Sequence, residues 1–215
     1  MNRASRFWRS TVGKKIVMAV SGLIMIGFLI LHVAGNLQIF ESANKLNTYS
    51  AFLHGPANEL LWVVRIVLIV AVAAHIVSAY QLTMLDRAAR PVPYAQQKLQ
   101  AATIGSRTMR VGGVLLLAFI VVHILHFTTL TVQPAPMVPG DVYGNAIASF
   151  RIWWVTAFYV IAMIALGLHL YHGAWSSVRT LGFEQGNANP FSRPVALTLA
   201  VLLWAGFTIV PVAVY

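Results

Sequence analysis

Residues 16–40 read IVMAVSGLIMIGFLILHVAGNLQIF, a run of twenty-five residues without Asp, Glu, Lys or Arg. A helix needs about 20 apolar residues to cross the roughly 30 Å of hydrocarbon in a bilayer, so this run predicts a membrane span. It is longer than the apolar core of a cleavable signal sequence, about 7–15 residues, and no convincing A-x-A exit follows it. We therefore expect a helix that is retained, with one histidine, His32, inside the membrane.

Four further apolar runs follow, at 60–82, 111–130, 152–178 and 194–214, and the first of these contains one base, Arg65. The chain has 215 residues, of which 59% are hydrophobic and 9% charged, and its mean hydropathy is +0.75. Soluble domains carry about 25% charged residues. Because backbone polar groups in lipid must be satisfied internally, the spans should be helices. We predict an all-α membrane protein with one domain over residues 1–215, a bundle of five transmembrane helices.

Positive charge is unevenly distributed between the ends of these spans. The chain has 15 Lys and Arg against 5 Asp and Glu. Twelve bases precede the first span or fall in the second and fourth connections, and three fall on the other side: Lys45, Arg65 and Arg151. Bases clustered between apolar runs indicate topology and not nucleic-acid binding, and the positive-inside rule places the N-terminus in the cytoplasm. Residues 3–10, RASRFWRS, predict a segment on the inner membrane surface.

The chain contains no cysteine. This excludes, within the chain, disulfides, cysteine nucleophiles, thiolate metal sites, iron–sulfur ligation and covalent haem attachment. A haem held by histidine alone remains open.

Six of the seven histidines fall within predicted spans. A histidine in lipid is either neutral and bonded to a neighbouring helix, or functional. At about 1.5 Å per residue, His32 and His123 lie past the midpoint of spans that run outward. His75 and His169 reach the inner half of spans that run inward. The histidines therefore pair by depth, one pair in each half, and two imidazoles at one level suit six-coordinate haem iron.

Small residues recur at fixed distances from these histidines. Gly22 precedes His32 by ten residues, and Gly113 precedes His123 by ten. We expect both glycines near the level of the inner pair, where they would make room for a flat macrocycle; ordinary close packing of helices is the alternative.

Two more histidines, His126 and His172, each lie one turn beyond a paired histidine, on nearly the same face of the helix. Both could bond a haem propionate, a quinone oxygen or a water. Periodicity alone does not exclude either of them as the ligand.

Four stretches together resemble the membrane cytochrome b subunit of succinate:quinone oxidoreductases and fumarate reductases, in the single-chain class with five helices and two haems. They are SGLIMIGFLILH (21–32), AHIVSA (74–79), GVLLLAFIVVH (113–123) and HLYHGAW (169–175). The resemblance implies a bundle enclosing two haems b, with one axial ligand on each of the first four helices. The ligands are then His32 and His123 for the outer haem, and His75 and His169 for the inner haem.

The spacing of glycines in the family decides between neighbouring histidines. A glycine ten residues before the ligand selects His32 and His123. A glycine four residues after the fourth ligand, here Gly173, selects His169 over His172. At position 167 this chain has Gly where some fumarate-reducing members have a glutamate associated with proton movement. This departure favours succinate oxidation.

The resemblance also implies the function. The chain would anchor a flavoprotein subunit and an iron–sulfur subunit at the cytoplasmic face of a bacterial cytoplasmic membrane. It would pass their electrons through the haems to a quinone, expected to be menaquinone. It would carry no catalytic residue for succinate, and it lacks a dinucleotide fingerprint. The oligomeric state of the complex is left open.

Haem propionates and a quinone need polar partners. Candidates for the propionates are Arg107, Arg110, Arg179 and His172 at the inner end, and Arg65, Arg151 and His126 at the outer end. As an alternative, the inner arginines only set the topology of the chain or bind lipid headgroups. Because quinone reduction takes up protons, its site should lie at a membrane rim. The candidates are Asn47, Tyr49, His54 and Glu59 outside, or Ser21, Arg107 and Trp175 inside. A solvated loop is the alternative for the outer group.

Two other functions remain. A cytochrome b anchor of a hydrogenase or formate dehydrogenase also holds haem, but it takes electrons from a periplasmic partner, against which the basic cytoplasmic face argues. A haem-free transporter could use the histidines as a proton relay. It would need acidic or polar partners inside the spans, and these are scarce.

Overall fold

The structure is a computed structural model that describes residues 2–89, 104–183 and 192–215. Its described part is helical, and five stretches are long and apolar enough to cross a membrane. They are Thr11–Phe40, Asn58–Ala89, Ile104–Thr128, Trp153–Thr180 and Arg193–Val214. The predicted all-helical, multi-pass architecture is confirmed. The third stretch ends at Thr128, two residues earlier than predicted.

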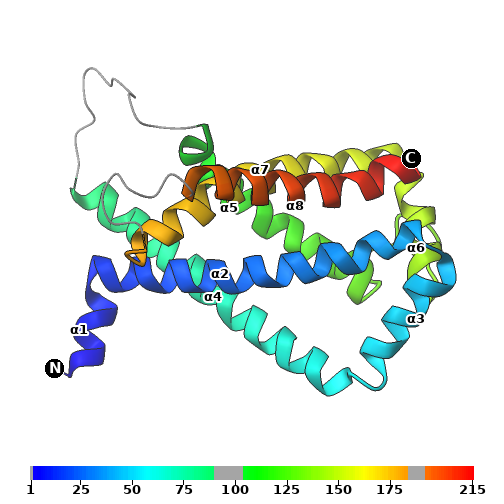
Figure 1. The fold of residues 1–215 in the computed structure, drawn as a ribbon, viewed down its shortest axis with the longest axis horizontal. Helices are drawn as coiled ribbons and strands as arrows, with labels where there is room; N and C mark the ends of the chain where they lie inside the picture. The colour runs from blue at the N-terminus through cyan, green and yellow to red at the C-terminus, as the bar shows by residue number, and fades with distance from the viewer. Residues whose placement is uncertain (1, 90–103, 184–191) are drawn as a thin grey trace.

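The helices alternate in direction along the bundle (Figure 1). In chain order the elements are α1 (Arg3–Arg9), α2 (Thr11–Asn36), the 3-10 turn Leu37–Phe40, α3 (Ala43–His54), α4 (Asn58–Ala89), α5 (Ile104–His123), the π-helical turn Ile124–Thr128, α6 (Val142–Phe150), α7 (Trp153–Thr180) and α8 (Ser192–Val214). The end of α4 and the start of α5 lie at the same end of the bundle as α1, which we call the inner end. The helices α3 and α6 and the C-terminus lie at the opposite, outer end.

The helix α7 is the centre of the bundle. It packs against α2, α5 and α8, and α2 in turn packs against α4. Eight residues of α7 are buried, against two of the longer α4. Figure 1 shows α4 crossing α2 and diverging from it toward α3. Most of the surface of α4 is therefore left to the surroundings, as expected for a helix in lipid.

A sharp corner joins α1 to α2. The Ser10 side chain accepts a hydrogen bond from the Gly13 amide at 2.9 Å and so caps α2. The buried Lys14 ammonium donates to the carbonyls of Trp8 and Arg9, at 2.8 and 3.0 Å, and satisfies the end of α1. The segment predicted to lie on the membrane surface is thus a short helix with an exposed Trp8.

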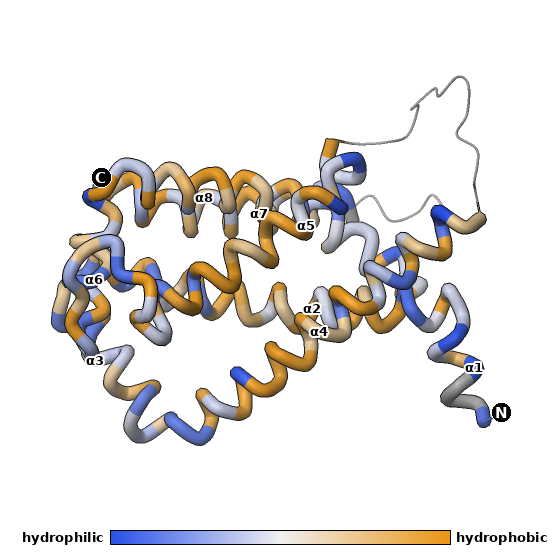
Figure 2. The backbone as a smooth tube through the Cα atoms, turned by 180° about the vertical axis from the view of Figure 1, so that it is seen from behind, coloured by the Kyte–Doolittle hydropathy of each residue, from blue (hydrophilic) through white to orange (hydrophobic). Residues whose placement is uncertain are grey.

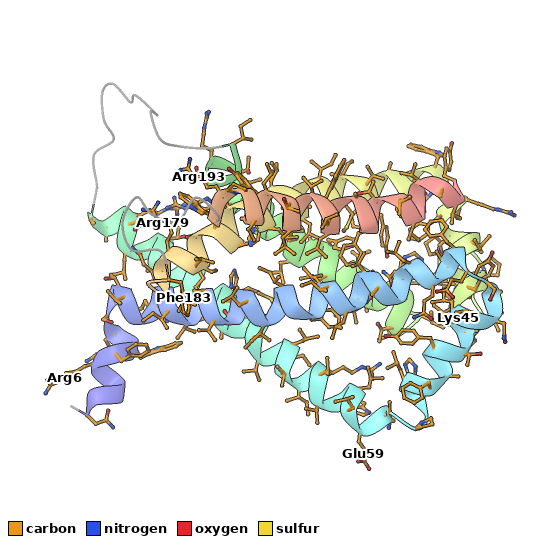
Figure 3. The ribbon with its side chains drawn as sticks, viewed as in Figure 1. Arg6, Lys45, Glu59, Arg179, Phe183 and Arg193 are labelled. Carbon is orange, nitrogen blue, oxygen red and sulfur yellow. The ribbon has the colours of Figure 1, made fainter. Side chains whose placement is uncertain are left out.

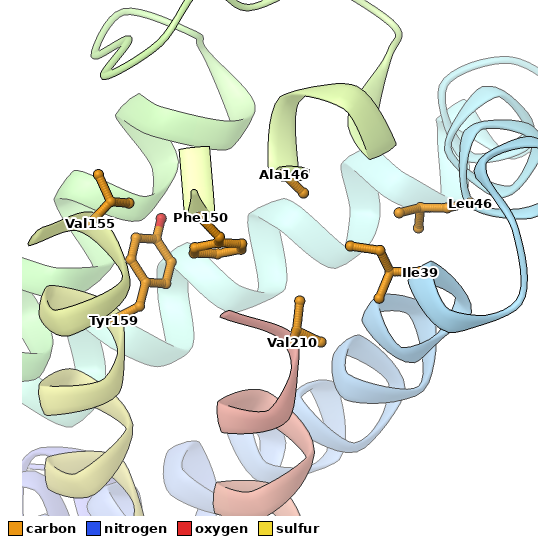
Figure 4. Packing of buried hydrophobic residues seen from close by; sticks show 7 residues of the cluster. All are labelled: Ile39, Leu46, Ala146, Phe150, Val155, Tyr159 and Val210. Carbon is orange, nitrogen blue, oxygen red and sulfur yellow. The ribbon is translucent and has the colours of Figure 1, made fainter. Parts of the chain in front are cut away.

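The outer end is closed by α3 and α6, which sequence analysis did not predict as helices. Ser42 and Asp141 are their N-caps. Asn47 clasps the two helices together: its Nδ2 donates to Asp141 Oδ1 at 2.8 Å, and its Oδ1 accepts from the Tyr143 amide at 3.0 Å. Behind this clasp an apolar cluster joins α3, α6, α7 and α8; it comprises Ile39, Leu46, Ala146, Phe150, Val155, Tyr159 and Val210 (Figure 4). Residues 43–54 are therefore part of the folded bundle and not a solvated loop.

Hydrophilic residues are concentrated at the two ends of the bundle. Figure 2 shows hydrophobic residues along the middle of the long helices and hydrophilic residues at α1, α3 and α6. Figure 3 shows Arg6, Arg179 and Arg193 at the inner end and Lys45 at the outer end. Of the bases used to predict topology, Arg90 and Lys98 lie outside the described residues.

Candidate functional site

The structure brings the histidines together in the two pairs that depth predicts. The ring centroids of His32 and His123 lie 5.9 Å apart, and those of His75 and His169 lie 6.1 Å apart. A metal held between two imidazoles at about 2 Å from each nitrogen separates the ring centres by about 6 Å. Both distances therefore match the spacing of two axial ligands.

The two pairs lie at different depths. A Cβ added at Gly22 would lie 3.5 Å from His75 Cε1, so Gly22 marks the level of the inner pair on α2. His32 follows ten residues later on the same helix, which is about 15 Å along its axis. The bundle thus carries one histidine pair in each half, both reached from the central helices.

Within the part of the chain that the structure describes, the helices that carry each histidine pair are not in close contact with each other. In the described residues α2 does not pack closely against α5, nor α4 against α7, so each pair bridges helices that stand apart. A Cβ added at Gly113 or Gly173 would meet no atom within 4 Å. A half-open pocket of about 250 Å³ lies between α5 and α7 with an almost wholly apolar lining, and of the four paired histidines His169 is the one that lines it. An apolar macrocycle requires room and a lining of this kind.

The two histidines of the inner pair differ in the hydrogen bonds of their Nδ1 atoms. His75 Nδ1 lies 3.0 Å from the Met18 carbonyl and 3.3 Å from Ser21 Oγ, while Ser21 itself donates to Val17 O at 2.7 Å. A proton on Nδ1 that is donated to a carbonyl leaves Nε2 for a metal, the usual arrangement of ligating histidines. His169 Nδ1, in contrast, is buried and has no hydrogen-bond partner among the described residues.

Other buried polar atoms without a partner lie in the same half of the bundle. Among the described residues there are six such atoms, and four belong to the inner halves of α4 and α7: Ser78 Oγ, Gln81 Oε1, His169 Nδ1 and Trp175 Nε1. Native interiors leave few such atoms unpaired. Their concentration here is what a bound polar or metal-containing group would relieve.

His126 and His172 differ from the paired histidines. His126 is 2% exposed and both of its ring nitrogens are engaged, Nδ1 with Tyr159 Oη at 2.9 Å and Nε2 with Ser149 Oγ at 2.9 Å. It has no nitrogen left for a metal, whereas His123 Nε2 has no hydrogen bond among the described contacts. His172 lies with its ring edge against Trp175, at 6.3 Å between centroids.

The basic residues proposed for propionates lie at the predicted ends. At the inner end the Arg179 guanidinium lies 4.9 Å from the centre of the Trp175 ring, and that of Arg193, which the sequence did not suggest as a propionate partner, lies 4.4 Å from it. Arg107 is exposed on α5, and Arg110 pairs with Asp86 at 3.3 Å. At the outer end Arg65 lies over Trp62 and approaches His54 Nε2 at 3.4 Å, and Arg151 is the exposed C-cap of α6.

The outer quinone candidates do not converge. Asn47 belongs to the clasp with Asp141, and the Tyr49 ring covers Gly35, where a Cβ would lie 2.9 Å from Tyr49 Cε1. His54 bonds back to Ser50 O at 2.9 Å, and Glu59 is exposed at the start of α4 (Figure 3). Of the inner candidates, Ser21 is buried beside His75.

Comparisons of the chain with protein-family models, with curated proteins and with solved structures found no match. The family resemblance therefore rests on the sequence stretches quoted above. Within residues 2–89, 104–183 and 192–215, no group of three or more His, Asp or Glu side chains is placed to hold a metal ion. A bis-histidine haem needs only two protein ligands, so the paired geometry fits haem better than it fits a bare metal ion.

Sequence analysis missed Tyr159 and Ser149, which contact the histidines at the outer level. Both lie on surfaces that become adjacent only when α6 folds against α7. The signal for α6 is present as Pro139-Gly140-Asp141, a turn followed by an N-cap residue. That signal predicts the helix, but it does not predict its contact with His126.

Proposed function

We propose that this chain is the membrane-anchoring, electron-transferring cytochrome b subunit of a succinate:quinone oxidoreductase, with two haems b. The observation that carries the proposal is the pair of histidine–histidine distances, 5.9 and 6.1 Å, at two depths of one five-helix bundle. Two levels about 15 Å apart are close enough to form an electron path across much of the bilayer.

The residues have separate roles in this proposal. His32 and His123 hold the outer group, and His75 and His169 hold the inner one. Room for the two bound groups is kept by Gly22, Gly113 and Gly173. Positive charge or hydrogen-bond donors at the inner end come from Arg179, Arg193 and His172. Haem, when bound, supplies one-electron transfer, while the protein supplies ligands, burial and polar partners.

The partners follow from what the chain lacks. It has no cysteine for iron–sulfur clusters and no dinucleotide fingerprint. A flavoprotein and an iron–sulfur protein would therefore dock at the inner, basic end, on the cytoplasmic side of a bacterial membrane. A quinone, menaquinone in this proposal, would accept the electrons.

A reduced-minus-oxidised spectrum of the purified protein tests the proposal. We expect the α-band of b haem and two haems per chain. H32A, H75A, H123A and H169A should each lose one of the two haems, while H172A, which removes only a donor one turn from His169, should keep both. Purification together with a flavin-containing protein, and reduction of the haem by succinate, would identify the enzyme.

A chain without haem would contradict the proposal and favour a histidine-relay transporter. Haem that is reduced by formate or hydrogen but not by succinate would favour the other respiratory anchors. If H172A lost the inner haem and H169A did not, the choice of ligand in α7 would be wrong.

A further inference from the structure

The Tyr159 hydroxyl lies between two imidazoles at the outer level. Its oxygen is 3.3 Å from His123 Nδ1 and 2.9 Å from His126 Nδ1, and His126 Nε2 is 2.9 Å from Ser149 Oγ. Tyr159, His126 and Ser149 are 6%, 2% and 0% exposed. This chain of contacts begins at a proposed iron ligand and ends on α6, and every member after His123 is buried.

Aromatic rings hold the Tyr159 hydroxyl in place. Phe150 and Phe119 pack edge-on against the Tyr159 ring, with centroids 5.0 and 5.2 Å away. Figure 4 shows Tyr159 beside Phe150 in the apolar cluster. The turn that carries His126 is π-helical and begins directly after His123. Turns of this kind are rare and are frequently found at functional sites.

One assignment of protons satisfies all three contacts when His123 Nε2 binds a metal. A neutral imidazole that ligates through Nε2 carries its proton on Nδ1, so His123 donates to Tyr159 Oη. The hydroxyl then donates to His126 Nδ1. His126 must in consequence carry its proton on Nε2, which donates to Ser149 Oγ.

We propose that Tyr159, held by His126 and Ser149, is a positioning residue for His123: it fixes Nε2 as the iron-binding nitrogen and lowers the reduction potential of the outer haem. This inference rests on the proposed function. An Nδ1–H that donates to a good acceptor makes the imidazole a stronger ligand, which favours the more positively charged ferric state. The Tyr159 oxygen is a better acceptor because its own proton is donated to His126, since linked hydrogen bonds strengthen one another.

Potentiometry of the b-haem absorbance in the full chain, in membranes or in its native complex, tests the inference. Y159F removes the hydroxyl and keeps the ring that packs against Phe119 and Phe150. At the potential that half-reduces the outer haem in the parent, we expect the ratio of reduced to oxidised haem to rise several-fold. A tenfold rise corresponds to about 59 mV for one electron. The low-temperature electron paramagnetic resonance of the ferric outer haem should change as well, and that of the inner haem should not.

Y171F is the matched control, because Tyr171 lies on the same helix and packs in the separate cluster with Leu170, Ala200 and Leu203. It should leave the outer haem unchanged. S149A should shift the outer potential in the same direction as Y159F but less, because it acts through His126. If Y159F loses the outer haem altogether, the potential of the outer haem in S149A becomes the test of the inference.

An unchanged outer-haem potential in Y159F, or in S149A where Y159F has lost the outer haem, would overturn the inference and leave the proposed function intact. A parent chain without haem would instead overturn the proposed function. The haem content of the parent therefore separates the two failures.

Discussion

His75 and His169 face each other with ring centroids 6.1 Å apart, although the helices that carry them, α4 and α7, do not pack closely together in the described residues. Their side chains bridge the distance between the two backbones. His32 and His123 do the same between α2 and α5. The proposed function explains why four different helices place their histidines in two such pairs.

The first prediction concerns Gly22, which lies against His75. A Cβ at this position would meet His75 Cε1 at 3.5 Å, an ordinary contact, so G22A should keep both haems. G22L places three more carbon atoms against the ring, and we expect loss of the inner haem with retention of the outer one. Haem per chain, measured from the pyridine haemochrome spectrum, should fall from two to one.

Gly27 provides the control for this experiment. It lies on the same helix, and a Cβ there would meet nothing within 4 Å. G27L should therefore keep both haems. Two haems in G22L would show that Gly22 serves only helix packing.

Much of the fold follows from the sequence, for identifiable reasons. The five spans are predicted because hydrophobicity over about 20 residues is decided locally, by the bilayer. The pairing of histidines is predicted because depth follows from residue number at a fixed rise per residue. The α3 and α6 helices were missed because they are short, and their position depends on the clasp that Asn47 makes with Asp141, 94 residues away. The outer quinone candidates, residues 47 to 59, were grouped only because they are close in sequence. In the structure their side chains contact different neighbours.

The second prediction concerns orientation. The chain has no cysteine, so single cysteines can be introduced without background. Phe183 and Val138 lie outside the spans at opposite ends of the bundle and are 73% and 59% exposed. With the N-terminus in the cytoplasm, a membrane-impermeant maleimide should label V138C in right-side-out vesicles and F183C only in inverted ones. Labelling in the opposite sense would reverse the topology and the face at which partner subunits dock.

The third prediction concerns the acid stability of the outer cap. Hydrogen bonds from the Gly144 amide and from the Asn47 side chain hold the pKa of Asp141 below its ordinary value. A carboxyl whose pKa is lower in the folded state adds stability above its unfolded pKa, about 3.9, and that stability is lost as pH falls through the folded value. The unfolding temperature of the parent should therefore exceed that of D141N at pH 6.

The difference between the parent and D141N should shrink as the pH falls below about 4, because the parent carboxyl then becomes neutral as well. Asn is itself a good N-cap, so D141N tests the charge and D141A tests the cap. A difference that stayed constant down to pH 3 would show that the charge of Asp141 contributes nothing.

The fourth prediction concerns the corner between α1 and α2. A Cβ at Gly13 would fall on the backbone carbonyl of Phe7, which cannot move without moving α1. We expect G13A to release α1 from the corner, and tryptic cleavage after Arg6 and Arg9 to become several-fold faster. Since Ala favours helix over Gly by about 1 kcal/mol, faster cleavage would report the clash and not the helix propensity. G27A, where the added methyl has open space, should be cleaved at the parent rate. If G13A were cleaved no faster than G27A, the corner would tolerate the methyl group and Gly13 would not be needed to position α1 at the inner surface.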